Sequence, residues 1–153
     1  IELAEQDRLV VSSLTDNDEH RQLKIMGYFD GYRRFRDDWI SAVIESEELV
    51  GHNIFWYAGK LDFRALTKDG RLVIFDFKTG PIARWVEIQT AAYLEAVLNR
   101  HREINPDDIW HAAIKLNSDG TYEKPIISQD RSKFKIFLNA LAVVNYCDNK
   151  RAG

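Results

Sequence analysis

The chain is poor in cysteine and has no long apolar segment, and each of these absences excludes a class of protein. Its 153 residues include one cysteine, Cys147. One cysteine cannot form a disulfide framework or a four-cysteine zinc or iron–sulfur site. No apolar run approaches the roughly 20 residues of a membrane-spanning helix, and no signal-peptide pattern is present. We therefore expect a cytoplasmic protein with no membrane partner and no iron–sulfur cluster.

The sequence also lacks an excess of basic residues. Its 21 lysines and arginines are outnumbered by 24 aspartates and glutamates, which gives a net charge of −3. This balance argues mildly against nucleic-acid binding, because phosphate contacts usually need a basic surface. Divalent cations held by clustered carboxylates would reverse the sign of the local charge. The basic residues nearest the acidic motifs described below would then face phosphates, or they are solvated strand edges: Lys60, Arg64, Lys68, Arg71 and Arg84.

Length and hydrophobic periodicity predict one domain of the α/β class (α+β mixed), because 153 residues can bury a core of their own. The pattern predicts helices over residues 19–40, 84–100 and 134–145, and strands over residues 42–50, 54–66, 71–78, 109–116 and 122–127. The strand at 71–78 is apolar on both faces, which is typical of a central strand covered on each side. We expect a central mixed β-sheet flanked by helices. The last helix should turn these side chains inward: Phe134, Phe137, Leu138, Leu141 and Val144.

Two acidic motifs on a predicted hairpin form the strongest candidate site. Gly59-Lys60-Leu61-Asp62 precedes the turn signal Lys68-Asp69-Gly70, and Asp76-Phe77-Lys78-Thr79-Gly80 follows it. Asp76 and Lys78 are two residues apart on a strand, so their side chains leave the same face. Two carboxylates and a lysine suit a hard divalent cation, Mg²⁺ or Mn²⁺, and an activated water. The alternative is a pair of surface acids on a hairpin, with Lys78 in a salt bridge to Asp76.

The helix after this hairpin contributes two further candidates. Gln89 and Tyr93 are i,i+4 neighbours, so one face of the helix can present both toward the end of the Asp76 strand. They either position a substrate and the lysine or make a helix-to-sheet hydrogen bond. The four histidines show no metal-ligand spacing, and we interpret them as structural or exposed: His20, His52, His101 and His111.

In order and spacing, these motifs resemble the PD-(D/E)xK nuclease superfamily, and within it the branch of the RecB nuclease domain and the phage exonucleases. That branch carries a Gly-x-x-Asp strand, an Asp/Glu-x-Lys strand continuing as Lys-Thr-Gly, and a helix with Gln-x-x-x-Tyr. The resemblance implies a restriction-endonuclease-like core spanning residues 1–153 as a single nuclease domain. It implies a metal held by Asp62, Asp76 and the backbone carbonyl of Phe77. Glu47, twelve residues before Gly59, is a lesser site candidate, for which a solvated strand glutamate is the alternative.

The same resemblance implies a metal-dependent DNA exonuclease of recombination, repair or phage DNA processing, acting in a bacterial or phage-infected cell. DNA would be its substrate, with a second copy of the chain or a recombination protein as a further partner. The alternative is a catalytically weak DNA-binding or assembly module that keeps the nuclease fold. A site-specific endonuclease is a third possibility, but it needs a target-recognition insertion that 153 residues scarcely accommodate.

The start of the chain suggests a missing segment. The sequence opens at Ile1 inside what reads as a helix, Ile1-Glu2-Leu3-Ala4-Glu5. Members of the family carry a metal-binding histidine upstream of such a segment. We therefore expect the chain to be N-terminally truncated, with that histidine before Ile1.

Overall fold

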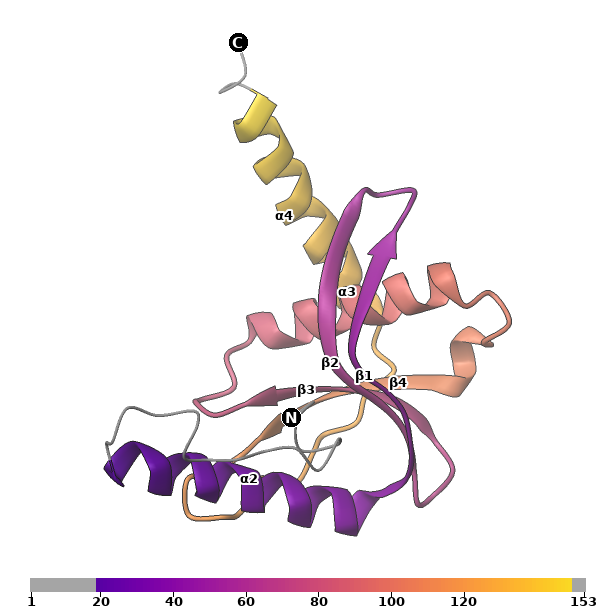
Figure 1. Cartoon of the computed structure of the whole chain (residues 1–153). Helices are drawn as coiled ribbons and strands as arrows, with labels where there is room; N and C mark the ends of the chain where they lie inside the picture. The colour runs from indigo at the N-terminus through magenta and orange to yellow at the C-terminus, as the bar shows by residue number, and fades with distance from the viewer. Residues whose placement is uncertain (1–18, 150–153) are drawn as a thin grey trace.

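The fold is a four-stranded mixed sheet with helices on both faces, as Figure 1 shows. The computed structural model describes residues 19–149. In chain order the elements are α2 (Glu19–Trp39), β1 (Ile40–His52), β2 (Tyr57–Thr67), β3 (Leu72–Lys78), α3 (Trp85–Arg100), the 3₁₀ turn η2 (Pro106–Asp108), β4 (Ile109–Lys115) and α4 (Ser132–Asn149). No helix in this part of the chain is both long and apolar enough to cross a membrane. The predicted helix at Ile1 lies outside the described residues.

The order of the strands in the sheet is β1-β2-β3-β4. The β1–β2 and β2–β3 pairs are antiparallel, whereas β3 and β4 are parallel and are joined through α3. A parallel pair requires such a crossover, because a tight hairpin can join only antiparallel strands. The predicted turn at residues 68–70 is present, with Gly70 at a φ of 85°, a conformation that glycine adopts without steric cost.

The β1–β2 hairpin is longer than the sheet to which it belongs. Its pairing runs from Ile40 opposite Thr67 to His52 opposite Tyr57. The β2–β3 ladder is much shorter and ends at the pair Phe63 and Phe75. The outer half of the hairpin therefore leaves the sheet and rises beside α3 and α4 (Figure 1).

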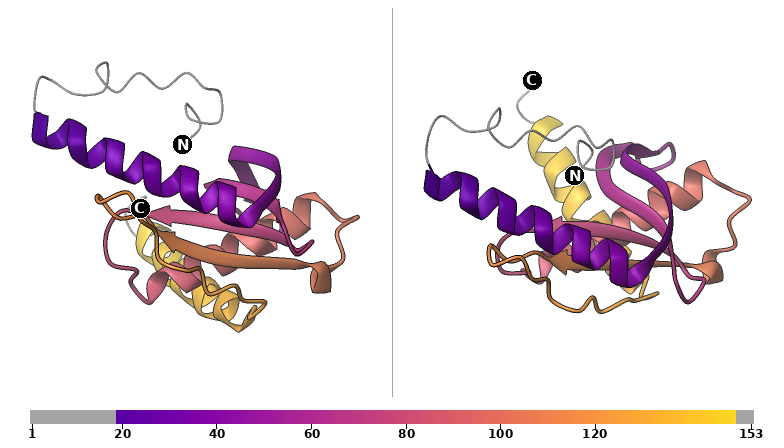
Figure 2. Two further views of the ribbon diagram at one scale, coloured as in Figure 1. Left: turned by 90° about the horizontal axis from the view of Figure 1, so that it is seen from below. Right: turned by 60° about the horizontal axis from the view of Figure 1, so that its bottom comes forward.

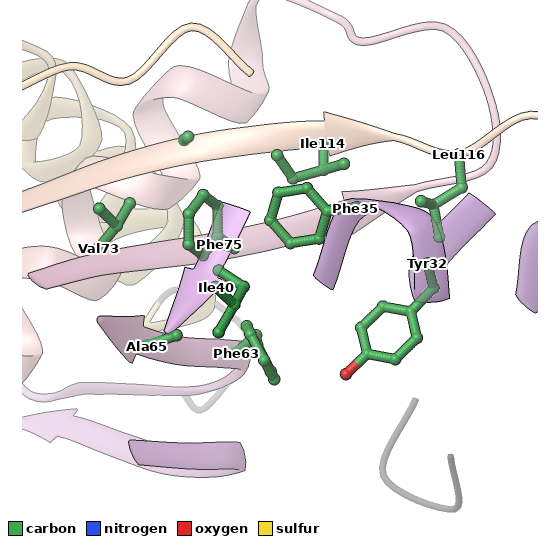
Figure 3. Close-up of a cluster of buried hydrophobic side chains, with 10 residues drawn as sticks. Tyr32, Phe35, Ile40, Phe63, Ala65, Val73, Phe75, Ile114 and Leu116 are labelled. Carbon is green, nitrogen blue, oxygen red and sulfur yellow. The ribbon is translucent and has the colours of Figure 1, made fainter. Parts of the chain in front are cut away.

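Two apolar clusters pack on opposite faces of β3. On the α2 face, Phe35 lies with its ring centroid 5.1 Å from that of Phe75, inside the cluster drawn in Figure 3. On the α3 face, Ile74 packs with Leu94 and Val97. Figure 2 shows α2 and α3 on the two sides of the sheet. The prediction of a central strand covered on both faces is thus confirmed.

The structure corrects two predicted elements. The predicted strand at 122–127 is wrong, because this segment forms one isolated bridge, Leu116 with Tyr122, and a second, His111 with Ser128, follows it. Pro125 in this segment has no N–H group to donate, which interrupts a ladder. The predicted inward orientation of Val144 on the last helix is also wrong, since 54% of this residue is exposed.

Candidate active site

Asp62 lies where β2 separates from β3. The ladder between these strands ends one residue away, at Phe63, and the carboxylate fills the gap by accepting a hydrogen bond from the backbone N–H of Phe77, at 2.8 Å. Burial raises the pKa of Asp62, this hydrogen bond opposes the rise, and the charges of Asp76 and Glu47 add to it. The charge of Asp76, the second predicted metal ligand, therefore disfavours the ionisation of Asp62.

Asp76 is a buried carboxylate with one main partner. It is 2% exposed, and burial raises its pKa, with the neighbouring Lys78 ammonium opposing the rise. The Lys78 Nζ lies 2.6 Å from Asp76 Oδ2, and no other group in the described part of the chain donates to that oxygen. A buried charge needs a partner or a metal, because its desolvation is otherwise uncompensated. The predicted salt bridge between Asp76 and Lys78 is present.

A chain of polar contacts connects Lys78 to α3. The Lys78 ammonium donates to Gln89 Oε1 at 3.4 Å, and Gln89 Nε2 donates to the Tyr93 hydroxyl at 2.9 Å. The Tyr93 ring lies against Gly59, where an added Cβ would be 2.6 Å from Cε1 of the ring. The structure therefore brings together the glycine, the lysine and both helix residues of the motif, and it shows that the glycine makes room for Tyr93.

Glu47 lies at the margin of this group. It has a φ of 56°, an unfavourable conformation for a residue with a side chain, and its carboxylate forms a 2.5 Å ion pair with Lys60. Its charge still contributes to the raised pKa of Asp62. The adjacent Glu48 is buried instead and pairs with Arg64 at 2.9 Å. Arg64, considered above as a phosphate contact or a solvated edge, is thus a buried partner of a glutamate.

The residues present suit a divalent cation. The N–H and C=O groups of a strand residue point to the same side, so the Phe77 carbonyl faces the gap into which its N–H donates. This carbonyl and the two carboxylates are hard oxygen donors, of the kind that Mg²⁺ prefers. In residues 19–149 no group of three or more histidine, cysteine, aspartate or glutamate side chains is placed to hold a metal. The candidate site therefore has two carboxylates and a carbonyl, with water and substrate oxygens left to complete an octahedron.

The sequence did not indicate three neighbours of this site. Trp85, at the start of α3, places its ring centroid 5.5 Å from the Lys78 ammonium. Lys115 lies opposite Lys78 in the β3–β4 register and pairs with Glu123 at 2.5 Å. Because side chains alternate along a strand, the sequence predicts which face of the sheet carries Lys115. Its position beside Lys78 depends on the pairing register of β3 and β4, which only the fold determines.

His111 has a structural position that agrees with the sequence interpretation. Its ring is 3% exposed, and its Nδ1 lies 2.8 Å from the Thr90 hydroxyl of α3. Its Nε2 lies 3.3 Å from the backbone carbonyl of Asp130. Burial lowers the pKa of His111, so the ring is held neutral between two elements.

A hollow of about 330 Å³ lies next to the candidate site, between α3 and β4. It is lined in part by Ala113, which is the β4 neighbour of Asp76 in the sheet register. Lys124 and Lys133 also line it, together with Glu87 and Glu123. Volumes of this size are common for small-molecule sites, but Asp62, Asp76 and Lys78 do not line this one.

Comparison with known proteins assigns the chain to no family. No protein-family model matches it, and no curated protein matches it with significance. Function must therefore be argued from the site itself.

Proposed function

We propose that this chain is a Mg²⁺- or Mn²⁺-dependent deoxyribonuclease with a restriction-endonuclease-like core. The observation that carries the proposal is the arrangement at the divergence of β2 and β3. There, the Asp62 carboxylate accepts the Phe77 N–H, the charge of the buried Asp76 acts on Asp62, and the Lys78 ammonium lies beside Asp76. A purely structural pair of aspartates would not need to meet at a cost to their own ionisation.

Each side chain has a distinct role in this proposal. Asp62, Asp76 and the Phe77 carbonyl would hold the cation, which when bound would act as a Lewis acid on a phosphate oxygen and lower the pKa of water. Lys78 would leave its ion pair with Asp76, orient the attacking water and stabilise the negative charge that develops on the phosphate. Gln89 would hold the ammonium in position, and Tyr93 would hold Gln89.

DNA is the substrate in this proposal, and exonucleolytic action in recombination, repair or phage DNA processing is its expected use. The net charge of −3 implies that the bound cation itself supplies much of the local attraction for phosphate. The second candidate, a DNA-binding or assembly module without turnover, is favoured by the Asp76–Lys78 ion pair, which occupies both groups. The two candidates differ in one measurable property, metal-dependent turnover.

The test is cleavage of linear and circular DNA with Mg²⁺, Mn²⁺ or a chelator. We expect metal-dependent degradation of linear DNA, and little attack on a closed circle if the enzyme is an exonuclease. Asp76→Ala should abolish cleavage and Mn²⁺ binding, and Lys78→Ala should keep Mn²⁺ binding yet slow cleavage by on the order of 10²–10³-fold. Asp37→Ala is the matched control, because Asp37 is an exposed aspartate on α2.

The outcomes separate the candidates. DNA binding without cleavage under all metal conditions would favour the assembly module. Cleavage by Lys78→Ala at the parent rate would restrict Lys78 to a structural partner of Asp76 and contradict the proposed mechanism. Mn²⁺ affinity unchanged in Asp76→Ala would place the metal elsewhere.

A further inference from the structure

The terminal helix α4 is largely apolar, yet its described side chains are half-buried at most. Between Ile136 and Cys147 the sequence has no charged residue. Even so, none of the residues from Ser132 to Cys147 is buried, and the large exposed side chains are Ile136, Val143, Val144 and Tyr146. A helix that is apolar on all sides is normally covered on all sides. The described part of the chain leaves most of α4 uncovered.

The side chains of α4 are most exposed in the second half of the helix, which extends away from the sheet. Its first turns are fixed to α3, where Arg131 forms a 2.5 Å ion pair with Glu95. Residues 142–147 are all exposed, and six consecutive residues exceed one helical turn of 3.6 residues, so every side of the helix faces solvent there. Figure 1 shows this part of α4 extending away from the sheet.

The tip of the β1–β2 hairpin continues the same surface. Phe55 and Tyr57 of the hairpin contact the rings of Phe134 and Phe137 on α4, with centroids 5.7 and 4.7 Å apart. The tip exposes three apolar residues: Ile54 at 65%, Phe55 at 40% and Trp56 at 86%. We call these three residues, together with Ile136, Val143, Val144 and Tyr146, the apolar end of the molecule.

We propose that the apolar end is a dimer interface, and that its occupant is the apolar end of a second copy of this chain. The available area agrees with this occupant. At about 200 Å² for a buried aromatic side chain, the exposed fractions of Phe55, Trp56 and Tyr146 provide roughly 400 Å² per copy. Two copies, with four exposed aliphatic residues on each, then exceed the total of about 1,000 Å² that a specific interface needs.

Charge also favours a second copy. A twofold interface places the same patch of each copy against its equivalent, so any charge in the patch faces an identical charge. The uncharged stretch from Ile136 to Cys147 avoids this repulsion. The hairpin contributes no acidic residue from Leu49 to Leu61. The one lysine or arginine of that stretch, Lys60, forms an ion pair with Glu47, so the apolar end can meet itself with little like-charge repulsion.

The test is sedimentation of the whole chain over a wide range of protein concentration, in the absence of metal and DNA. We expect a reversible monomer–dimer equilibrium. Val144→Glu places two like charges in the symmetric interface and should raise the dimer dissociation constant on the order of 10²-fold. Leu23→Glu is the matched control, since Leu23 is an exposed aliphatic residue, 65% exposed, on α2. Trp56→Ala tests whether the hairpin tip takes part, and should also weaken the dimer.

At a concentration where the parent is monomeric, both glutamate variants should keep its unfolding temperature, because both positions are exposed in the monomer. A chain that stays monomeric at every concentration would overturn the proposal and leave the apolar end for a different protein. A dimer that Val144→Glu does not weaken, or that Leu23→Glu weakens equally, would overturn it by placing the interface elsewhere. None of these results depends on nuclease activity.

Discussion

At the scale of single residues, the two carboxylates of the candidate site carry a free-energy cost for folding. Burial raises the pKa of both Asp62 and Asp76, so the folded state binds their protons more tightly than the unfolded chain does. Stability contributed by such a group is complete below the unfolded pKa and is lost as pH rises through the folded pKa. At neutral pH, both ionised carboxylates therefore oppose folding until a cation compensates them.

Asp62→Asn tests this cost. Asparagine keeps an oxygen that can accept the Phe77 N–H but carries no charge. We expect the variant to be more stable than the parent at pH 7, and the difference to vanish as pH falls below about 4, near the unfolded pKa of aspartate. Thermal unfolding across this pH range measures the effect. Adding Mn²⁺ should raise the unfolding temperature of the parent but not of the variant. A variant less stable than the parent at pH 7 would make Asp62 a structural residue.

Gly59→Ala tests the contact beneath Tyr93. The added methyl would lie 2.6 Å from Tyr93 Cε1, so the ring must move, and the Gln89–Lys78 contacts depend on that ring. We expect Gly59→Ala to slow DNA cleavage while leaving Mn²⁺ affinity near the parent value. Gly80→Ala is the control, because nothing lies within 4 Å of a Cβ added there. Equal cleavage by both variants would remove Tyr93 from the positioning of Lys78.

At the scale of elements, local pattern predicts most of the fold but not its exceptions. The continuous apolar run of β3 and the turn at Gly70 are local signals, and both elements are present in the structure. The segment at 122–127 fails as a strand because Pro125 interrupts the ladder, a warning that the sequence already contained. For α4, periodicity located the helix but could not show that Val144 stays uncovered by residues 19–149.

The candidate site likewise has features that the sequence predicts and features that it does not. Asp62, Asp76 and Lys78 could be proposed from spacing because they lie on one hairpin. The contact of Gly59 with Tyr93 connects residues more than thirty positions apart and depends on the docking of α3. The burial of Glu48 with Arg64, and not of Glu47, depends on irregular pairing early in β1 that shifts its register. Sequence periodicity carries no information about such shifts.

His111 of β4, which contacts Thr90 of α3, leads to a prediction on the pH dependence of stability. Burial lowers its pKa, so the stability it contributes is present above about 6.5, the unfolded value, and is lost as pH falls toward the folded pKa. His111→Gln does not titrate, so its stability should change less between pH 7 and pH 5 than that of the parent. It should also be less stable at pH 7, by about 1–3 kcal/mol, if a buried hydrogen bond is lost. Urea unfolding at both pH values measures both effects.

His20→Gln is the control for this pair of measurements, because His20 is an exposed histidine on α2. The other buried histidine, His52, also has a lowered pKa and should leave a residual pH dependence in every variant. Identical pH dependence in the parent and in His111→Gln would show that the pKa of His111 is the same in the folded and unfolded states.

At the scale of the whole molecule, β3 makes the two apolar clusters one folding unit. Its alternate residues pack against α2 on one face and α3 on the other, and its C-terminal end carries Asp76, Phe77 and Lys78. Phe77 links the α2 cluster to the candidate site. Its ring lies 5.4 Å from that of Tyr32 in the α2 cluster, while its backbone donates to Asp62. Phe77 therefore belongs both to the core and to the candidate site.

Phe35→Ala and Leu94→Ala, on opposite faces of the sheet, test whether the two apolar clusters fold as one unit. Both residues are fully buried, one in each cluster, so each variant should lose on the order of 3–4 kcal/mol of unfolding free energy. Because both clusters share β3, we expect each variant to unfold in one transition with the parent's denaturant dependence. Mn²⁺ should stabilise both variants by the same increment as the parent, since neither side chain touches the carboxylates and the increment depends only on metal affinity. Two transitions in either variant would show that the sheet faces fold separately. An increment lost only in Phe35→Ala would instead show that the α2 cluster sets the metal site through Phe77, whose ring lies 5.6 Å from that of Phe35.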